Sequence, residues 1–384
     1  MSLPLFGRHR ATLSLVGCAV AVSLLAGCAQ PGPSSMPPPS TAVPGQLQEL
    51  ARFDHQVTGV TVSPANRIFV NFPRWTDDAP VSVAEVLPDG RVRPFPNEEW
   101  NAWRNARKDE MTAADHFVCV QSVVVDHQGY LWALDAAAPA QGPVVPMGPK
   151  LVKIDLSSDR VVKTIAFDEK IAPHGSYLND VRFSTDGKTA YITDSGARGA
   201  IVVVDLVQGT ARRVLDGHAS TQVDKTVQVK ADGQVLRRPD GRGVEFSADG
   251  IALSVDGTML YWQAIKGKTL YRVPTRALGD VSAAPRLPSM VETVGENGPV
   301  DGMLFGRDGR LFLTSPEDDS VKVRDSNGGL RVLAQSPALR WPDTMAQGAD
   351  GTLYVTASRI QDMSWYKPGS PNSLPTTLFR ITNP

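Results

Sequence analysis

The sequence is poor in cysteine and has almost no excess charge. Its three cysteines, Cys18, Cys28 and Cys119, leave only one in the body of the chain once the N-terminal segment described below is set aside. A disulfide within the mature protein is therefore excluded. The 39 Lys and Arg residues balance 40 Asp and Glu residues, which argues against a nucleic-acid partner held by bulk positive charge.

Several catalytic and cofactor motifs are also missing. The sequence has no nucleophile elbow, phosphate loop, dinucleotide fingerprint, paired CxxC or zinc-binding pair of histidines. We therefore expect no nucleotide or haem cofactor. Cys119 stands in the apolar run Phe117–Val120, which is typical of a buried structural thiol rather than a nucleophile.

The N-terminal segment is typical of a bacterial lipoprotein signal. Arg8 and Arg10 precede an apolar run that is too short to span a membrane comfortably, and this run ends in Leu-Ala-Gly-Cys28. This pattern predicts a signal peptide over 1–27, a lipidated Cys28, and a Pro-rich tether over 28–46. We expect a protein of the bacterial cell envelope, periplasmic or outer-membrane anchored, and a plain secretory signal with a chance cysteine is the alternative.

The remaining chain, 47–384, is rich in glycine and proline and repeats one pattern. Each copy opens with a polar residue, alternates apolar and polar side chains, turns, and resumes as a second strand. The opening residues are Thr58, Gln121, Asn179, Asp249, Asp301 and Asp343, and the turn residues are Asn66, Gly129, Gly187, Gly257, Gly309 and Gly351.

Six such units predict an all-β protein, a six-bladed β-propeller with four-stranded blades. A β-sandwich or two tandem β-domains would not explain the sixfold pattern. The last unit is one strand short, and the early segment Gln48–Phe53 has no sheet of its own. We expect this N-terminal strand to close the last blade, which removes exposed strand edges.

Two insertions interrupt the repeat. The segment 98–110, with Trp100 and Trp103, has a helical pattern, and 212–245 is polar and predicts an extra hairpin. Each either covers one mouth of the channel or fills an edge between blades.

The blade sequences resemble the major royal jelly protein/Yellow family. The resemblance rests on segments that include Phe72-Pro-Arg-Trp75, Leu131-Trp-Ala-Leu-Asp135, Tyr177-Leu-Asn-Asp-Val181 and Asp249-Gly-Ile-Ala-Leu-Ser254. It implies a secreted six-bladed propeller whose activity varies between members, some of which bind amines or sterols while others are linked to dopachrome conversion. The paired cysteines of the insect members are absent here.

The six opening residues are the candidate ligand-binding ring, because the first strand of each propeller blade lines the central channel. Two carboxylates about 6 Å apart repel by roughly 3 kcal/mol at an effective dielectric near 20, so Asp249, Asp301 and Asp343 need compensation. A bound cation, an amine ligand, raised carboxyl pKa values or local hydrogen bonds would each provide it. In the last case these side chains only cap the strand-entry loops.

Calcium or another divalent cation is the metal that hard oxygen ligands favour, with Asn179, Asp249 and Asp301 as candidate ligands. Gluconolactonase-like propellers hold such an ion at comparable blade positions, which supports the idea by analogy. His174 is the candidate proton shuttle of a tautomerisation, and a solvated loop histidine is the alternative. Trp75, Trp100 and Trp262 either stack on a ligand or pack between blades.

Together these patterns favour a lipid-anchored, monomeric propeller that binds a small polar or aromatic molecule at the channel mouth, with or without dopachrome-isomerase activity. A metal-dependent gluconolactonase-like hydrolase and a non-catalytic interaction platform are the alternatives.

Overall fold

The protein is described by a computed structural model that covers residues 45–75, 78–369 and 373–384. The expected signal peptide, Cys28 and nearly all of the tether lie outside the described residues. Among the residues that are described, no helix is long and apolar enough to cross a membrane.

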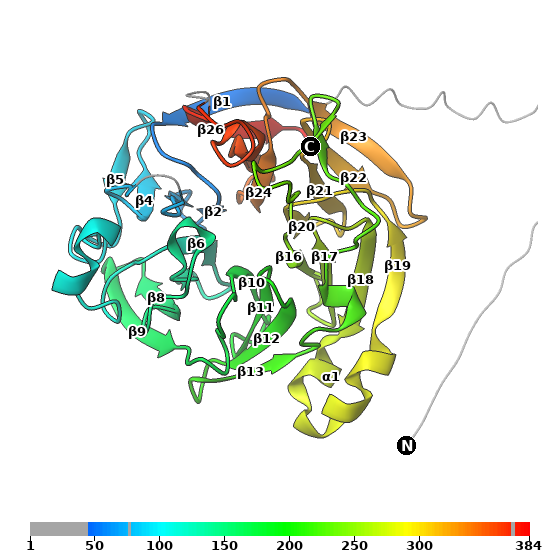
Figure 1. Cartoon of the computed structure of the whole chain (residues 1–384), viewed down its shortest axis with the longest axis horizontal. Coiled ribbons are helices and arrows are strands. Elements are labelled where there is room, and N and C mark those ends of the chain that lie inside the picture. Colours follow the sequence, from blue (N-terminus) through cyan, green and yellow to red (C-terminus); the bar gives the residue numbers. More distant parts are fainter. Residues whose placement is uncertain (1–44, 76–77, 370–372) are drawn as a thin grey trace, which may run out of the picture. The chain divides into compact units, whose positions relative to one another are not determined.

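Six four-stranded antiparallel sheets surround a common axis, which confirms the predicted propeller (Figure 1). The first blade contains β2 (Val60–Val62), β3 (Ile68–Asn71), β4 (Val83–Val86) and β5 (Val92–Pro94). The second contains β6 (Val120–Val125), β7 (Leu131–Asp135), β8 (Lys150–Asp155) and β9 (Arg160–Ala166). The third contains β10 (Leu178–Phe183), β11 (Thr189–Asp194), β12 (Ala200–Asp205) and β13 (Thr210–Val214).

The fourth blade contains β16 (Ala248–Leu253), β17 (Met259–Ala264), β18 (Thr269–Pro274) and β19 (Glu292–Glu296). The fifth contains β20 (Met303–Phe305), β21 (Leu311–Ser315), β22 (Ser320–Arg324) and β23 (Leu330–Gln335). The sixth contains β24 (Pro342–Gln347), β25 (Leu353–Ala357), β26 (Thr376–Thr382) and β1 (Gln46–Phe53). In Figure 1 the first strand of every blade lies nearest the axis.

The N-terminal strand closes the ring as predicted. β1 is the outer strand of the sixth blade and pairs with β26 from Gln46 opposite Thr382 to Phe53 opposite Thr376. The strand begins two residues earlier than the expected Gln48, because Gln46 and Leu47 find partners on β26. Both ends of the chain's folded part are thus held in one sheet.

The strand connections define two faces of the ring. Turns between the first and second strands and between the third and fourth strands lie on one side, the turn face. The connections between the second and third strands and those between successive blades lie on the other side, the loop face. The turn residues Gly129, Gly187, Gly257, Gly309 and Gly351 all have positive φ, and Asn66 takes the same conformation with φ 61°, as a tight hairpin turn requires.

The core lies between neighbouring blades. One cluster joins Phe69 of β3 and Val83 of β4 to Val123 of β6 and Leu131 of β7, and all four are fully buried. Side chains on the facing sides of two neighbouring blades are thus buried against each other, and this contact between blades holds the ring together.

The structure confirms the prediction for one of the two insertions and contradicts it for the other. The segment 212–245 contains the expected extra hairpin, β14 (Lys230–Ala231) and β15 (Gln234–Val235). The helix expected over 98–110 is wrong for most of its length: only a 3₁₀ helix, η1 (Asn105–Glu110), forms, and Arg107 breaks its geometry with φ −125°. Trp103 is instead buried against Ala113, Val118 and Ala137, so this segment fills a space beside the second blade.

Candidate functional site

The six predicted ring residues are buried at the loop-face end of the innermost strands. Their exposed fractions are all 8% or less. Four of them lie where the pairing of the first two strands skips a residue: Gln121 in β6, Asn179 in β10, Asp249 in β16 and Asp343 in β24. A β-bulge redirects a side chain, so the same local irregularity recurs from blade to blade at the ring.

Glycines after the ring residues allow neighbouring blades to approach closely. A Cβ atom on Gly250 would lie 2.2 Å from the backbone oxygen of Asp301, and one on Gly302 would lie 2.1 Å from that of Asp343. Side chains of the second strands add hydrogen bonds across the same junctions, such as Thr314 Oγ1 to the Asp343 oxygen at 3.1 Å. The ring is therefore built by tight backbone contact between adjacent blades.

Side chains in the acidic half of the ring form hydrogen bonds. Asn179 Nδ2 donates to Asp249 Oδ1 at 2.5 Å, and the carboxyl group of Asp301 lies close enough to that of Asp249 for the two to affect each other's pKa. Trp341 Nε1 donates to Asp301 Oδ2 at 2.6 Å. Two buried carboxyl groups that lie close together repel each other when both are ionised, which favours the protonated form of at least one of them.

Burial raises the pKa values of all three ring carboxyls. Desolvation raises the pKa of Asp301 to about 7, and desolvation with the nearby charges of Asp301 and Asp343 raises the pKa of Asp249 well above its usual range. Desolvation and the charge of Asp301 also raise the pKa of Asp343 well above its usual range. Raised carboxyl pKa values and local hydrogen bonds, two of the compensations considered from the sequence, are thus both present.

Sequence reasoning missed a fourth carboxylate and its counterion. Asp180, next to Asn179, accepts hydrogen bonds from Ser122 Oγ at 2.7 Å and from Arg182 Nη1 at 2.9 Å. Arg182 Nη2 also donates to the backbone oxygen of Met303 on another blade, at 2.9 Å. The only available signal was the Asn-Asp pair itself, because the partner from β20 is distant in sequence.

The other half of the ring is neutral. Thr58 Oγ1 donates to the backbone oxygen of Gln121 at 3.2 Å, and Gln121 Oε1 accepts from the hydroxyl group of Tyr177 at 2.9 Å. The same hydroxyl oxygen accepts a hydrogen bond from Trp75 Nε1 at 2.5 Å. Charge in the ring is thus confined to the blades that carry Asp180, Asp249, Asp301 and Asp343.

A cap encloses the ring on the loop face. Trp341, the partner of Asp301, packs in one apolar cluster with Ala231 and Leu236 of the 212–245 insertion and with Ile360 and Tyr366 of the β25–β26 connection. The insertion therefore covers the mouth, one of the two roles expected for it.

Ion pairs hold the tip of the cap. Asp232, in the turn of the β14–β15 hairpin, accepts from Arg340 Nη1 and Nη2 at 2.9 and 2.8 Å and from Lys367 Nζ at 3.3 Å. Hydrogen bonds from Arg340 lower the pKa of Asp232 to about 2. Arg340 and Lys367 also bind Asp362, so one network joins the hairpin to the loops around the mouth.

Below the ring, the channel continues as a cavity of about 440 Å³. It is lined by residues of all six innermost strands or of the turns that follow them. Arg182 lies along this cavity and also contacts Asp180 at the ring. The ring is thus bounded by the cap on one side and by an arginine on the other.

Comparison with known proteins identifies the family. The family model for major royal jelly protein matches residues 118–371. The chain belongs to the major royal jelly protein family. No curated protein matches the sequence.

This royal jelly family member is also similar to solved propellers. A gluconolactonase from Xanthomonas campestris shares 14% identity with a TM-score of 0.52, over 88% of this chain and 89% of that one. The calcium-binding protein regucalcin from Agrobacterium tumefaciens shares 16% identity with a TM-score of 0.52, over 88% and 93%. A luciferin-regenerating enzyme shares 10% identity with a TM-score of 0.53, over 88% and 95%. Identities this low show a common fold.

The donor atoms at the ring are of the type that a hard divalent cation prefers. Asn179, Asp249 and Asp301 come from three consecutive blades and offer only oxygen ligands, as Ca²⁺ prefers. Within the described ranges, however, no group of three or more His, Cys, Asp or Glu side chains is arranged to hold a metal ion. A cation at the ring would favour the ionised forms of Asp249 and Asp301, whose pKa values burial raises.

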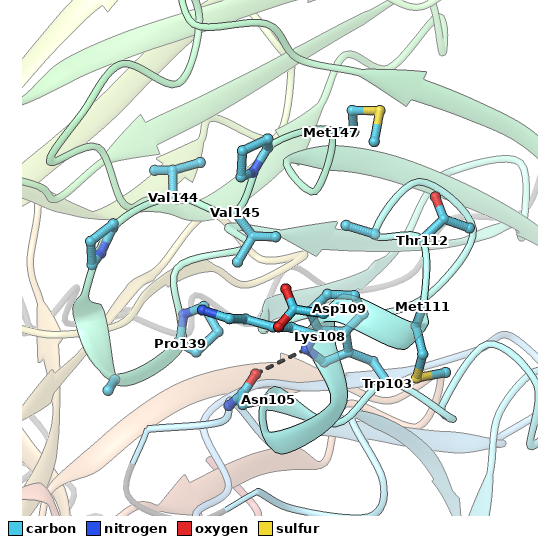
Figure 2. Close-up of a pocket in the computed structure, with 14 residues that line it drawn as sticks. Trp103, Asn105, Lys108, Asp109, Met111, Thr112, Pro139, Val144, Val145 and Met147 are labelled. Carbon is cyan, nitrogen blue, oxygen red and sulfur yellow. Dashed lines mark hydrogen bonds between the residues drawn. The ribbon is translucent and has the colours of Figure 1, made fainter.

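His174 lies on the loop face and is exposed. It lines a hollow of about 760 Å³ beside the connection between β7 and β8, together with Phe167 and Met147. Across this connection lies a second hollow of about 640 Å³, where Trp103, Met111 and Val145 surround the opening (Figure 2). The side chains that line this second hollow are largely apolar.

The candidate tryptophans are engaged in packing. Trp262 is fully buried and donates to the backbone oxygen of Ser220, and Trp100 packs on Phe117 with ring centroids 5.1 Å apart. Trp75 packs on Trp365 of the cap, with centroids 5.3 Å apart. Of the three, only Trp75 therefore lies beside the covered mouth.

Proposed function

We propose that this family member binds a small polar or aromatic molecule in its channel, with the acidic ring as the anchoring site for a cationic group. The observation that carries the proposal is the charge imbalance of the ring. Asp180 has Arg182 as its counterion, whereas Asp249 and Asp301 accept from an amide and an indole and have no cationic side chain within 4.0 Å among the described residues.

A cationic group would relieve this imbalance. Carboxyl groups that hold protons because they are buried together lose those protons when a positive charge comes close, since the charge stabilises their ionised forms. A protonated amine or a divalent cation would thus displace protons from the ring carboxyls. Trp75 and Trp365 pack on each other at the edge of the cap, and Arg238 lies over the Trp365 ring, so an aromatic ligand would have to displace Arg238 to stack there.

The test is a thermal shift measured with calcium, EDTA and dopamine in turn. A ligand that binds only the folded state raises the melting temperature in a concentration-dependent way. We expect Asp301→Asn to weaken this shift. Asp308→Asn is the matched control, because Asp308 lies in the turn of the same blade and pairs with Arg310. A flat response to every additive in all three proteins would contradict binding at the ring and favour a non-catalytic interaction platform.

A metal-dependent hydrolase of the gluconolactonase type is the second candidate. It is supported by the oxygen donors of Asn179, Asp249 and Asp301 and by the shared fold with a gluconolactonase and with a calcium-binding propeller. In that case lactone hydrolysis would depend on added divalent cation and be lost in Asp249→Asn. Hydrolysis that is absent with calcium, zinc and manganese alike would rule this candidate out.

Dopachrome conversion requires a group that carries a proton near neutral pH. Asp301, with a pKa of about 7, suits that role better than the exposed His174. Loss of dopachrome conversion in Asp301→Asn but not in His174→Ala is the expected pattern, and the reverse pattern would assign the role to His174.

We further propose that the chain is a lipoprotein of the bacterial envelope, attached through Cys28. The support is the Leu-Ala-Gly-Cys28 sequence at the end of the apolar run. Replacing Cys28 by Ala should abolish incorporation of labelled palmitate and release the protein from membranes. Labelling that survives the replacement would contradict the proposal.

A further inference from the structure

The first strand of the described chain begins on the turn face, and its last strand ends there. Gln46 pairs with Thr382 at the end of β26 that lies next to Leu353, the first residue after the Gly351 turn. Arg310, in the β20–β21 turn, donates to the backbone oxygen of Pro384 at 2.9 Å. Sixteen residues separate Cys28 from Gly45, and at most about 3.3 Å per residue this tether reaches about 50 Å.

Exposed valines gather on the same face in two adjacent blades. Val207 lies in the β12–β13 turn, Val255 in the β16–β17 turn, and Val281 between β18 and β19. Their exposed fractions are 62%, 52% and 69%. Single exposed apolar residues are common, and these three lie on the turn face of two adjacent blades.

The connection between β18 and β19 adds two arginines to this sector. It consists of α1 (Thr275–Gly279) and η4 (Val281–Met290) and projects outward from the ring (Figure 1). Its first residue, Thr275, is bonded through its backbone nitrogen and its hydroxyl group to the oxygens of Thr258 and Gly257 in the turn.

A hollow of about 420 Å³ on this connection is lined by Arg276, Arg286, Ser289 and Asp280, among others. Arg276 and Arg286 are exposed and form no ion pair within 4.0 Å among the described residues. Asp280 is the acidic group of the hollow, and its carboxylate accepts hydrogen bonds from the backbone and hydroxyl groups of Ser282. Two guanidinium groups against one carboxylate leave the hollow positive, which suits a phosphate.

We propose that the α1–η4 connection, with Val207 and Val255, is a membrane-contact surface that seats phospholipid phosphates between Arg276 and Arg286 and places Val281 at the headgroup boundary. This rests on the anchoring proposed above, because the tether brings the turn face to a bilayer at high local concentration. The capped mouth on the loop face then points away from the membrane.

The experiment uses the full mature chain on vesicles of phosphatidylethanolamine and phosphatidylglycerol. One sample is held by its own lipidated Cys28, and a second by a polyhistidine tag, replacing the lipid, on nickel-chelating lipid. An environment-sensitive fluorophore is attached at Val281→Cys or, as the control on the loop face, at Met147→Cys. Met147 is 68% exposed, and Cys119 is fully buried and does not compete for the label.

We expect spin-labelled lipids to quench the fluorophore at position 281 about threefold more than the one at position 147. Arg276→Gln with Arg286→Gln should remove most of this difference, whereas Arg237→Gln in the loop-face insertion should preserve it. Equal quenching at the two positions, or no effect of the arginine changes, would overturn the proposal. So would inhibition of the contact by millimolar inorganic phosphate, which would indicate a site for free phosphate.

The two anchors separate the two proposals. If the lipid is absent from Cys28 but the tagged protein shows the difference in quenching, the anchoring proposal fails while the surface stands. If Cys28 is lipidated and neither sample shows the difference, the surface fails while the anchor stands.

Discussion

An Asp-Gly pair occurs on both the turn face and the loop face of the propeller, but its contacts differ between the two faces. At the turns, Asp308 and Gly309 act within one hairpin: the carboxylate accepts from the Arg310 backbone, and the glycine has φ 81° with open space around it. At the ring, Asp301 and Gly302 act between blades: the carboxylate accepts from Trp341 of the next blade, and the glycine leaves space for that blade's backbone. An Asp-Gly pair therefore has no fixed meaning until its surroundings are known.

The largest effect that would test this comparison comes from adding a Cβ atom at the ring. Gly302→Ala should lower the free energy of unfolding by about 3 kcal/mol, because the Cβ would lie 2.1 Å from the oxygen of Asp343 and the two blades would have to separate. Denaturant unfolding measures this loss. Gly309→Asn should cost less than about 1 kcal/mol, since asparagine tolerates positive φ and Asn66 already adopts it at the first turn. Similar losses in both variants would contradict the distinction.

The pH dependence of stability should also differ between the two ends. The pKa of Asp301 rises from 3.8 to about 7 on folding, so the native state binds more protons than the unfolded state between these values. Its contribution to stability is therefore present below about pH 4 and is lost as the pH rises through about 7. Asp301→Asn should remove this pH-dependent loss in unfolding curves measured from pH 4 to 8.

The turn carboxyls provide the control for this titration. A hydrogen bond from the Ser254 hydroxyl lowers the pKa of Asp256, so its contribution has the opposite sign and is lost as the pH falls below the ordinary range. Asp256→Asn should leave the slope between pH 5 and 7 unchanged. If Asp301→Asn leaves that slope unchanged as well, Asp301 does not titrate as inferred.

The smallest expected effect concerns the cap. Asp232→Asn removes the carboxylate that binds Arg340 and Lys367, and because the Asp232 side chain is 49% exposed, we expect a loss of about 0.5–1 kcal/mol. Limited proteolysis of the 212–245 insertion should become faster. Asp240→Asn, in the same insertion but paired with Arg242 on the surface, should leave the cleavage rate unchanged. Equal rates in both variants would show that the ion pairs do not hold the cap closed.

The sequence by itself determined the propeller, because each blade is specified by local patterns. Strand alternation, a turn residue with positive φ and a polar opening residue recur six times, and the unpaired strand before the first copy predicted the closure by β1. These features depend on residues only a few positions apart, so they can be predicted from the sequence without knowing how the blades pack. The helix expected over 98–110 failed because burial of Trp103 beside the second blade outweighed a weak helical pattern.

Only the tertiary structure decided what surrounds the ring. The opening residues could be placed at one mouth from the repeat, but the bond from Trp341 to Asp301, the Asp180–Arg182 pair with its contact to Met303, and the cap over the mouth join segments from different blades. Such contacts depend on how the blades pack and not on the spacing of residues along the chain. The raised pKa values follow from the same cause, since desolvation is a property of the closed ring and not of any one aspartate in the sequence.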